Sequence, residues 1–302
     1  MDPVGYRGRF APTPSGPLHL GSLVTALGSF LDARAHQGDW LVRIDDVDPY
    51  RCRAGAADQI LRSLDALGLH WDGQVVYQSQ LEDRYQEGLD ALSKRDLLYA
   101  CDCPRRGRQG PSPPAHTIYQ GACREKGQSF VAGQNALRLR VGEAIIEGMD
   151  TLKGHFRVHL QEAVGDLIVY RRDQVPAYHL ATVLDDAAAG ITHIVRGEDL
   201  FPATPGQIHL QHLLGFAIPR YAHTPLLVDS SGAKLSKRTL AEEAEIKAPT
   251  QCLRELLDYL AHPAPKDLDQ ASTEDILTWA IAQWSMERLT GVGPIAIATS
   301  SP

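Results

Sequence analysis

The sequence has no apolar run long enough to span a membrane, and its first ten residues, MDPVGYRGRF, lack the apolar core of a signal peptide. Cysteine is scarce: there are five among 302 residues, and this odd number argues against a disulfide framework. Basic residues are fewer than acidic ones: 30 lysines and arginines against 37 aspartates and glutamates give a net charge of −7. We therefore expect a cytoplasmic protein without a membrane partner. Its acidity argues against a dedicated nucleic-acid binder but leaves room for a local basic face.

The remaining composition is that of an ordinary globular protein. Hydrophobic residues make up 43% of the chain and charged residues 22%, which excludes a disordered or fibrous chain. The length of 302 residues suits one large α/β domain with inserts, or two modest domains.

The first hundred residues alternate between strand and helix patterns. Residues 6–11 predict a short buried strand, which leads through the turn PTPSGP into a helix that stops near Gly38. Apolar residues recur along this helix with a 3.6-residue period: Leu20, Leu23, Val24, Leu27, Phe30 and Leu31. The segment WLVRID at 40–45 predicts a second strand, and a second amphipathic helix ends at Gly68. This order is typical of the opening of a doubly wound parallel sheet.

The pattern changes after about residue 98. Residues 101–123 predict a loop module with three cysteines, and the segments ALRLRV, HFRVHL and LIVYRR predict strands. Strand and helix patterns return at 176–228, and the final GVGPIAIATSSP is expected to be a loose tail. The expected organisation is a first half of a nucleotide-binding Rossmann-type domain (1–100), an insert with the cysteine module and strands (101–172), a second half of the catalytic domain with a lysine loop (173–238) and a short helical C-terminal region (239–302).

Two segments far apart in the sequence are suited to binding phosphates. In RFAPTPSGPLHLGS (9–22), a strand passes through a turn into a helix that starts near His19, and the free N–H groups of a helix start favour an anion. His19 can donate a hydrogen bond to a phosphate, and Gly21 lets a nucleotide approach the backbone. In GAKLSKR (232–238), two lysines flank a serine. Either segment alone is more often a tight turn or a solvated basic loop, but the ordered pair carries more weight.

Together these segments resemble the paired signatures of class I aminoacyl-tRNA synthetases, usually written HIGH and KMSKS. HLGS (19–22) matches the first with its last histidine replaced, and KLSKR (234–238) matches the second with two substitutions. The resemblance implies ATP with Mg²⁺ as a substrate. It assigns catalysis to His19, Gly21, Lys234 and Lys237, and ATP binding to His19, Gly21, Ser22 and Lys237. Attack of a carboxylate on the α-phosphate builds negative charge, and we assign Lys237 to the pyrophosphate side of that charge.

The segments RFAPTPSGPLHLGS, VRIDDVDPYR, YHLATVLDD and IVRGEDL resemble the glutamyl branch of this class. A glutamate site must hold two carboxylates and one ammonium, and arginine forks suit carboxylates. Arg9 and Arg196 lie at the ends of expected strands, where a doubly wound sheet places its ligands. Asp45 could hold the ammonium, and Tyr178 could supply a hydroxyl. By resemblance the glutamate pocket comprises Arg9, Phe10, Ala11, Pro12, Thr13, Asp45, Tyr178 and Arg196.

Two pocket positions depart from the family pattern. Asp45 occupies a position that is usually Glu, and Thr13 one that is usually Ser. Because aspartate is one methylene shorter, its contact with the ammonium must be remade, for instance through water.

The region after the lysine loop indicates a particular branch of the family. Only 64 residues follow Arg238, which is too few for the long helical anticodon-binding region of a glutamyl-tRNA synthetase. The chain therefore resembles the glutamyl-queuosine tRNA(Asp) synthetase family, the short paralogues. This resemblance implies L-glutamate, ATP and tRNA(Asp) carrying queuosine as partners, with a hydroxyl of the queuosine cyclopentenediol as acceptor. We expect a monomer.

The cysteine module is suited to one structural zinc ion. Cys101, Cys103 and Cys123 can supply three thiolates to a tetrahedral site. Residue chemistry alone favours His116 as the fourth ligand. The family pattern instead ends in Tyr-x3-Cys, which implies Tyr119, and we follow it while keeping His116 as the rival.

Three other functions remain open. One is a minimal glutamyl-tRNA synthetase that charges a 3′ end. Another is a different nucleotidyltransferase of the same superfold, against which the cysteine module and the glutamate pocket argue. The last is a non-catalytic RNA-binding paralogue, which would be expected to have lost His19 or Lys237.

Overall fold

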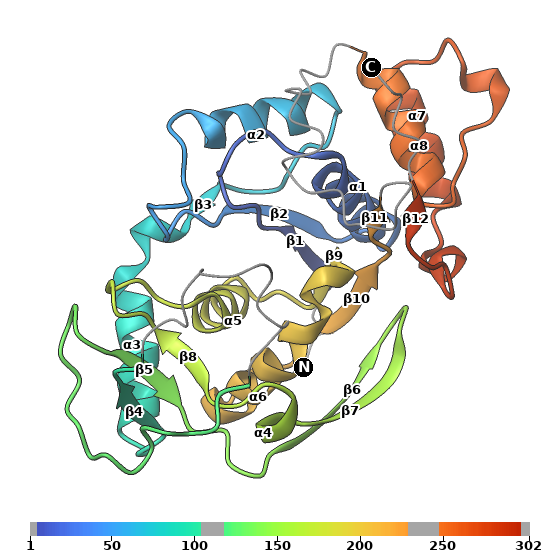
Figure 1. Ribbon diagram of the computed structural model, residues 1–302. Coiled ribbons are helices and arrows are strands. Elements are labelled where there is room, and N and C mark those ends of the chain that lie inside the picture. Colours follow the sequence, from blue (N-terminus) through green and yellow to red (C-terminus); the bar gives the residue numbers. More distant parts are fainter. Residues whose placement is uncertain (1–4, 104–117, 229–247, 297–302) are drawn as a thin grey trace.

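The computed structural model describes residues 5–103, 118–228 and 248–296, and Figure 1 shows the arrangement of its elements. The first elements are β1 (Arg7–Phe10), α1 (Leu20–Ala35), β2 (Asp39–Ile44), α2 (Ala56–Ala66), β3 (Val76–Tyr77), the 3-10 helix η1 (Gln78–Gln80) and α3 (Glu82–Ser93). The middle elements are β4 (Leu98–Cys101), β5 (Ala136–Leu139), β6 (Ile145–Asp150), β7 (Gly154–His159), α4 (Leu160–Ala163) and β8 (Leu167–Tyr170). The last elements are α5 (Tyr178–Ala188), β9 (His193–Gly197), η2 (Glu198–Ala203), α6 (Thr204–Leu214), β10 (Arg220–Thr224), β11 (Leu227–Val228), α7 (Pro249–Tyr259), η3 (Lys266–Leu268), α8 (Thr273–Gln283), η4 (Met286–Leu289) and β12 (Ile295–Ala296). Within these described ranges, no helix combines the length and apolarity needed to cross a membrane.

The centre of the molecule is built from two groups of mainly parallel strands. β1, β2 and β3 form one parallel sheet, in which Arg9 lies opposite Leu41. β9, β10 and β6 form a second parallel group, which β7 extends in the antiparallel sense. The backbone N–H of Thr192, just before β9, donates to the carbonyl of Arg7 at 2.9 Å, so β9 lies beside β1. The α/β class with parallel sheets expected from the sequence is therefore confirmed.

Helix α1 begins and ends close to where the sequence predicts. His19 is its N-cap, and the chain leaves the helix at Ala35 to return beside β1. A Cβ on Gly38 would lie 2.3 Å from the carbonyl oxygen of Tyr6, so this close return to β1 requires glycine. The stop signal in the sequence therefore reflects a packing constraint.

The strands of the insert region belong to two different sheets. β4, β5 and β8 form an antiparallel sheet of their own, whereas β6 pairs with β10 in the centre. The sequence pattern predicts strands at β5, β7 and β8 but none at β6. The ring of Phe156 packs against Gly148, where a side chain would clash with it, and the apolar Met149 is 66% exposed. Apolar and polar residues therefore do not alternate clearly along β6, and the sequence pattern of a strand is weak there.

Two large hydrophobic cores flank the central strands. The first joins β1, β2, α1 and α2 to the C-terminal helices α7 and α8, and the second joins α3, β5, β8, α5 and α6. A separate and much smaller cluster consists of Tyr99, Cys101 and Cys123, with Cys103 and Tyr119 against it.

The C-terminal region differs in one respect from expectation. α7 and α8 are helices, as the pattern predicted. The prediction of a loose tail is wrong at Ile295–Ala296, because these residues form β12, which pairs in parallel with β11. Ile295 of this strand is partly buried against the first core. The local sequence pattern does not predict this contact, because the contact is made with distant residues.

Candidate active site

A cavity of about 510 Å³ lies at the carboxyl ends of β1, β2 and β9. Side chains that follow neighbouring parallel strands converge at this edge of a sheet. All residues assigned to the glutamate pocket and to the start of α1 line this cavity: Arg9, Phe10, Ala11, Pro12, Thr13, His19, Gly21, Ser22, Asp45, Tyr178 and Arg196. The other two assigned residues, Lys234 and Lys237, lie outside the described residues, so their roles stay predictions.

The start of α1 forms one wall of the cavity. Nδ1 of His19 accepts a hydrogen bond from the backbone N–H of Ser22 at 3.2 Å, and its Nε2 lies 3.1 Å from the Ser22 hydroxyl. A Cβ on Gly21 would lie 3.3 Å from the imidazole, so glycine leaves room for the ring on the first turn. Gly21 is expected from the sequence to let a nucleotide approach the backbone, and in the structure it also makes room for His19. The helix dipole at this point favours an anion.

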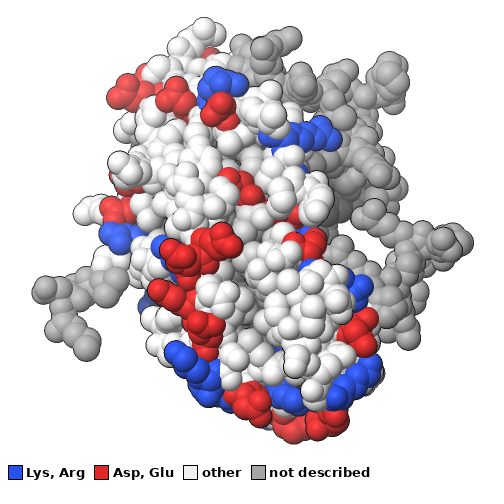
Figure 2. Space-filling view, turned by 90° about the vertical axis from the view of Figure 1, so that its left-hand side faces the viewer, with Lys and Arg blue, Asp and Glu red and all other residues white. Residues whose placement is uncertain are grey.

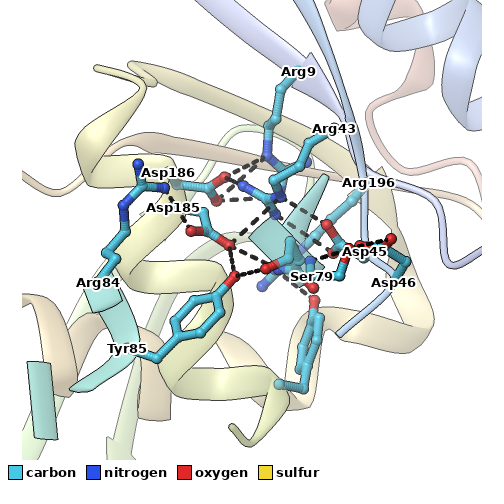
Figure 3. Close-up of polar contacts among 12 residues, drawn as sticks. Arg9, Arg43, Asp45, Asp46, Ser79, Arg84, Tyr85, Asp185, Asp186 and Arg196 are labelled. Carbon is cyan, nitrogen blue, oxygen red and sulfur yellow. Dashed lines mark hydrogen bonds and ion pairs between the residues drawn. The ribbon is translucent and has the colours of Figure 1, made fainter. Parts of the chain in front are cut away.

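Beneath the cavity, two arginines and two aspartates form a buried charge cluster (Figure 3). Arg9 on β1 pairs with Asp186 on α5 at 3.3 Å, while Arg43 on β2 contacts Asp186 at 2.6 Å and Asp45 at 2.7 Å. All four side chains are less than a tenth exposed. Burial acts to raise the pKa of Asp186, but Arg9 and Arg43 hold it below its usual value. Charges of opposite sign therefore compensate one another inside the fold.

Asp45 directly follows β2 and lines the cavity as a member of this cluster. Its carboxylate accepts a hydrogen bond from Nε of Arg43, so it is not directed at the cavity alone. Burial raises the pKa of Asp45 to about 6, although Arg43 acts in the opposite direction. The carboxylate is thus mostly ionised at pH 7, as a contact with an ammonium requires.

Sequence reasoning missed Arg43 and the aspartate pair at 185–186. Signals for both were present. Arg43 shares a strand face with Asp45, two residues later, and the aspartate pair interrupts an apolar helix pattern. Asp185 lies beside the cluster and accepts a hydrogen bond from Tyr85 at 2.9 Å (Figure 3), and it also accepts one from Gln78 at 2.8 Å.

Arg196 forms the opposite side of the cavity, and most of its guanidinium is already bound by the protein. Nε donates to Nε2 of His223 at 3.0 Å. Nη2 donates to Thr204 at 2.9 Å and to Gln207 at 2.7 Å. Nη1 lies 3.3 Å from the Tyr178 hydroxyl at the cavity wall. A carboxylate in the cavity can therefore meet the Nη1 edge of this arginine.

The three cysteines of the insert come together in the structure. Their Sγ atoms lie within 4.8 Å of one another, and those of Cys103 and Cys123 are 3.4 Å apart. Sulfur ligands of a tetrahedral zinc lie about 3.8 Å apart, given Zn–S bonds of about 2.3 Å. Oη of Tyr119 lies 3.6 Å from Sγ of Cys101 and accepts a hydrogen bond from the backbone N–H of Cys123 at 2.8 Å. The donor set fits a metal ion, whereas the rival ligand His116 lies outside the described residues.

The acid–base properties of the cysteine cluster point in the same direction. Burial acts to raise the pKa of Cys101, but contacts with Arg138 and Tyr119 outweigh it and lower the pKa to about 7. Burial and the neighbouring thiols raise the pKa of Cys103 to about 11. Three thiolates at this spacing therefore repel one another, and a divalent cation would relieve that repulsion.

Residues 6–257 match the family of class I tRNA synthetases (E and Q), catalytic domain. The chain is 48% identical over 284 residues to the glutamyl-Q tRNA(Asp) synthetase of Methylococcus capsulatus, which covers 94% of this chain and 93% of that protein. It is 46% identical over 296 residues to the protein of the same name from Thiobacillus denitrificans, with 96% of each chain covered.

Two solved structures of glutamate–tRNA ligases are also similar. The ligase of Elizabethkingia meningosepticum, in complex with its amino acid, has a TM-score of 0.74 at 23% identity and covers 96% of this chain. The synthetase of Elizabethkingia anophelis has a TM-score of 0.75 at 22% identity and covers 98%. This chain spans 66% and 68% of those two proteins, respectively. The likeness concerns the fold, and it confirms the class I synthetase fold that the paired signatures implied.

Proposed function

Because the chain belongs to the glutamyl-Q tRNA(Asp) synthetases, a family of class I tRNA synthetases, we propose that it activates L-glutamate with ATP and transfers it to the queuosine base in the anticodon of tRNA(Asp). One observation carries the proposal. Two buried arginines and a buried aspartate meet the start of α1 in a single cavity of about 510 Å³. This combination suits a dicarboxylic amino acid placed beside a nucleotide phosphate.

The two arginines offer cationic edges from opposite sides of the cavity. Nη1 of Arg9 makes no hydrogen bond within the described residues, and Nη1 of Arg196 contacts only the Tyr178 hydroxyl there. Each edge can receive one carboxylate of glutamate, while Asp45 receives the ammonium. The α-carboxylate is already ionised at neutral pH, so the site has to orient it rather than remove a proton.

The start of α1 supplies the phosphate side of the reaction. Attack of the α-carboxylate on the α-phosphate of ATP forms glutamyl-adenylate and releases pyrophosphate, and negative charge grows on the phosphate oxygens. The first turn of α1 lines the cavity at Gly21 and Ser22, so the positive end of its helix dipole is expected to stabilise this charge. Lys234 and Lys237 are expected to neutralise the pyrophosphate.

We also infer one structural zinc ion, held by Cys101, Cys103, Tyr119 and Cys123. When bound, zinc would supply the positive charge that keeps the three thiols deprotonated. The spacing of the sulfur atoms and the position of the Tyr119 oxygen support this ligand set. None of these four residues lines the cavity, so no chemical step is assigned to the ion.

The surface charge bears on how the RNA approaches. The side of the molecule on which α3 lies carries a band of acidic side chains (Figure 2). α3 itself exposes Glu82, Asp83, Glu87 and Asp90. RNA phosphates would be repelled there, so we expect tRNA(Asp) to bind another face.

The decisive experiment locates labelled glutamate on the RNA. Purified protein is incubated with labelled glutamate, ATP, Mg²⁺ and tRNA(Asp) with or without queuosine, or with tRNA(Glu). Ribonuclease A then separates the 3′-terminal adenosine from the anticodon fragment. Label should appear on the anticodon fragment of queuosine-containing tRNA(Asp) alone. Label on the terminal adenosine of tRNA(Glu) would identify a minimal glutamyl-tRNA synthetase, and no label with any RNA would favour a non-catalytic RNA-binding paralogue.

A further inference from the structure

Three adjacent central strands carry a buried polar chain behind Arg196. Arg196 on β9 lies opposite His223 on β10, and β10 pairs with β6 through Tyr221 and Asp150 (Figure 1). The side chains of His223 and Asp150 are both fully buried. The strand register thus brings a carboxylate, an imidazole and a guanidinium into line.

The hydrogen bonds of this chain determine the tautomer of His223. Nε of Arg196 always carries a proton and donates it to Nε2 of His223, so Nε2 must be unprotonated. Nδ1 of His223 therefore carries the proton and donates to Oδ2 of Asp150 at 2.6 Å. The other oxygen of Asp150 accepts from the backbone N–H groups of Leu152 and Lys153 at 3.0 and 2.9 Å. The Thr204 hydroxyl, which accepts from Nη2 of Arg196, also lies 3.2 Å from Nε2 of His223 and can donate to it.

We propose that Asp150 and His223 are positioning residues for glutamate, because they orient the guanidinium of Arg196 so that its Nη1 edge faces the cavity. The inference rests on the proposed function, since it takes the group bound at Arg196 to be a carboxylate of glutamate. His223 holds Nε, while Thr204 and Gln207 hold Nη2, so the plane of the group is determined at two points. Asp150 ends β6, and the insert region thereby contributes to amino-acid binding.

The variant Asp150→Asn tests this inference because it keeps the shape of the side chain and changes one hydrogen-bonding group. Its amide oxygen is needed by the backbone N–H groups of Leu152 and Lys153, so its NH₂ group must face His223. Nδ1 of His223 must then accept a hydrogen bond, and the proton moves to Nε2. Two N–H groups would meet between His223 and Arg196, and Arg196 would have to turn away.

The experiment measures glutamate-dependent exchange of pyrophosphate into ATP, together with ¹⁵N chemical shifts of the His223 ring. For Asp150→Asn, the KM for glutamate should rise by about 10-fold or more, while kcat and the KM for ATP change by less than about 3-fold. The ring proton should move from Nδ1 to Nε2. His223→Gln, which keeps an acceptor for Arg196, should stay closer to wild type than His223→Asn, which keeps only the donor to Asp150.

Asp32→Asn is the matched control. Asp32 is another buried carboxylate, which accepts hydrogen bonds from Tyr6 at 2.5 Å and Trp284 at 3.0 Å and does not line the cavity. This control should lower Tm but leave the KM for glutamate unchanged. A wild-type KM in Asp150→Asn, or a rise shared equally by ATP, would overturn the positioning role. Wild-type protein without glutamate-dependent exchange would overturn the proposed function instead.

Discussion

The glutamate pocket and the cysteine cluster are both polar sites, but different forces hold them together. In the pocket, Arg9 and Arg43 are compensated by Asp45 and Asp186, and large apolar cores lie on both sides. The cysteine cluster gathers three thiols and a phenol around a very small core. A site that contains its own counter-charges can be preorganised by the chain alone. A site that gathers only acidic groups, such as thiols and a phenol, is expected to need a bound cation to hold them together.

The largest effect is expected from breaking the cysteine cluster. Cys101→Ser should abolish retention of about one zinc per chain, as measured by elemental analysis. We expect this variant to lose about 3 kcal/mol of unfolding free energy, which corresponds to a fall in Tm of roughly 6–12 °C for a domain of 150–250 residues. Calorimetry can measure this fall. Cys52→Ser, at a cysteine outside the cluster, should retain the metal. Wild-type protein purified without chelators and found free of zinc would remove the contrast between the two sites.

The next effect concerns the charge balance of the pocket. Arg196→Ala removes a carboxylate anchor, so the KM for glutamate in pyrophosphate exchange should rise by about 30- to 100-fold, or roughly 2–3 kcal/mol. The value of kcat should change less, because the anchor acts in the ground state and the transition state alike. Arg7→Ala provides the control, since Arg7 makes an exposed ion pair with Asp39. Equal effects of the two substitutions would contradict the assignment of Arg196.

A pH dependence should distinguish the pocket further. Burial raises the pKa of Asp45 to about 6, so its carboxylate is ionised above that pH and protonated below it. As the pH falls from 7 to 5, the ionised fraction drops to roughly a tenth, and the KM for glutamate should rise by up to about 10-fold. Asp45→Asn should have a high KM that stays flat over this range. A flat profile in the wild-type protein would mean that Asp45 does not hold the ammonium.

The smallest expected effect identifies the fourth ligand of the cysteine cluster. Tyr119→Phe should speed the loss of zinc to a chelator by about 5-fold, or roughly 1 kcal/mol, because one ligand atom is removed. His116→Ala should leave the rate of zinc loss unchanged. The reverse order of the two variants would transfer the fourth position to His116.

Local features of the sequence were sufficient to predict much of the framework and part of the site. The 3.6-residue apolar period, the helix start near His19 and the stop signal at Gly38 are short-range signals, and the structure has α1 at Leu20–Ala35 between β1 and β2. Once these strands are parallel, the residues after them must meet at one edge. For this reason strand order and residue type suffice to group Arg9, Asp45 and Arg196, and all three line the cavity.

Tertiary structure alone decided which groups compensate and orient those side chains. Arg43 and Asp186 lie 143 positions apart, and Asp150 and His223 lie 73 apart, so no local pattern connects them. The pairing of β12 with β11 likewise depends on a contact across most of the C-terminal region. The two buried polar pairs share one physical reason. A buried charge is tolerated only with a partner, and strand register and helix packing, which form between distant segments, determine which partner it meets.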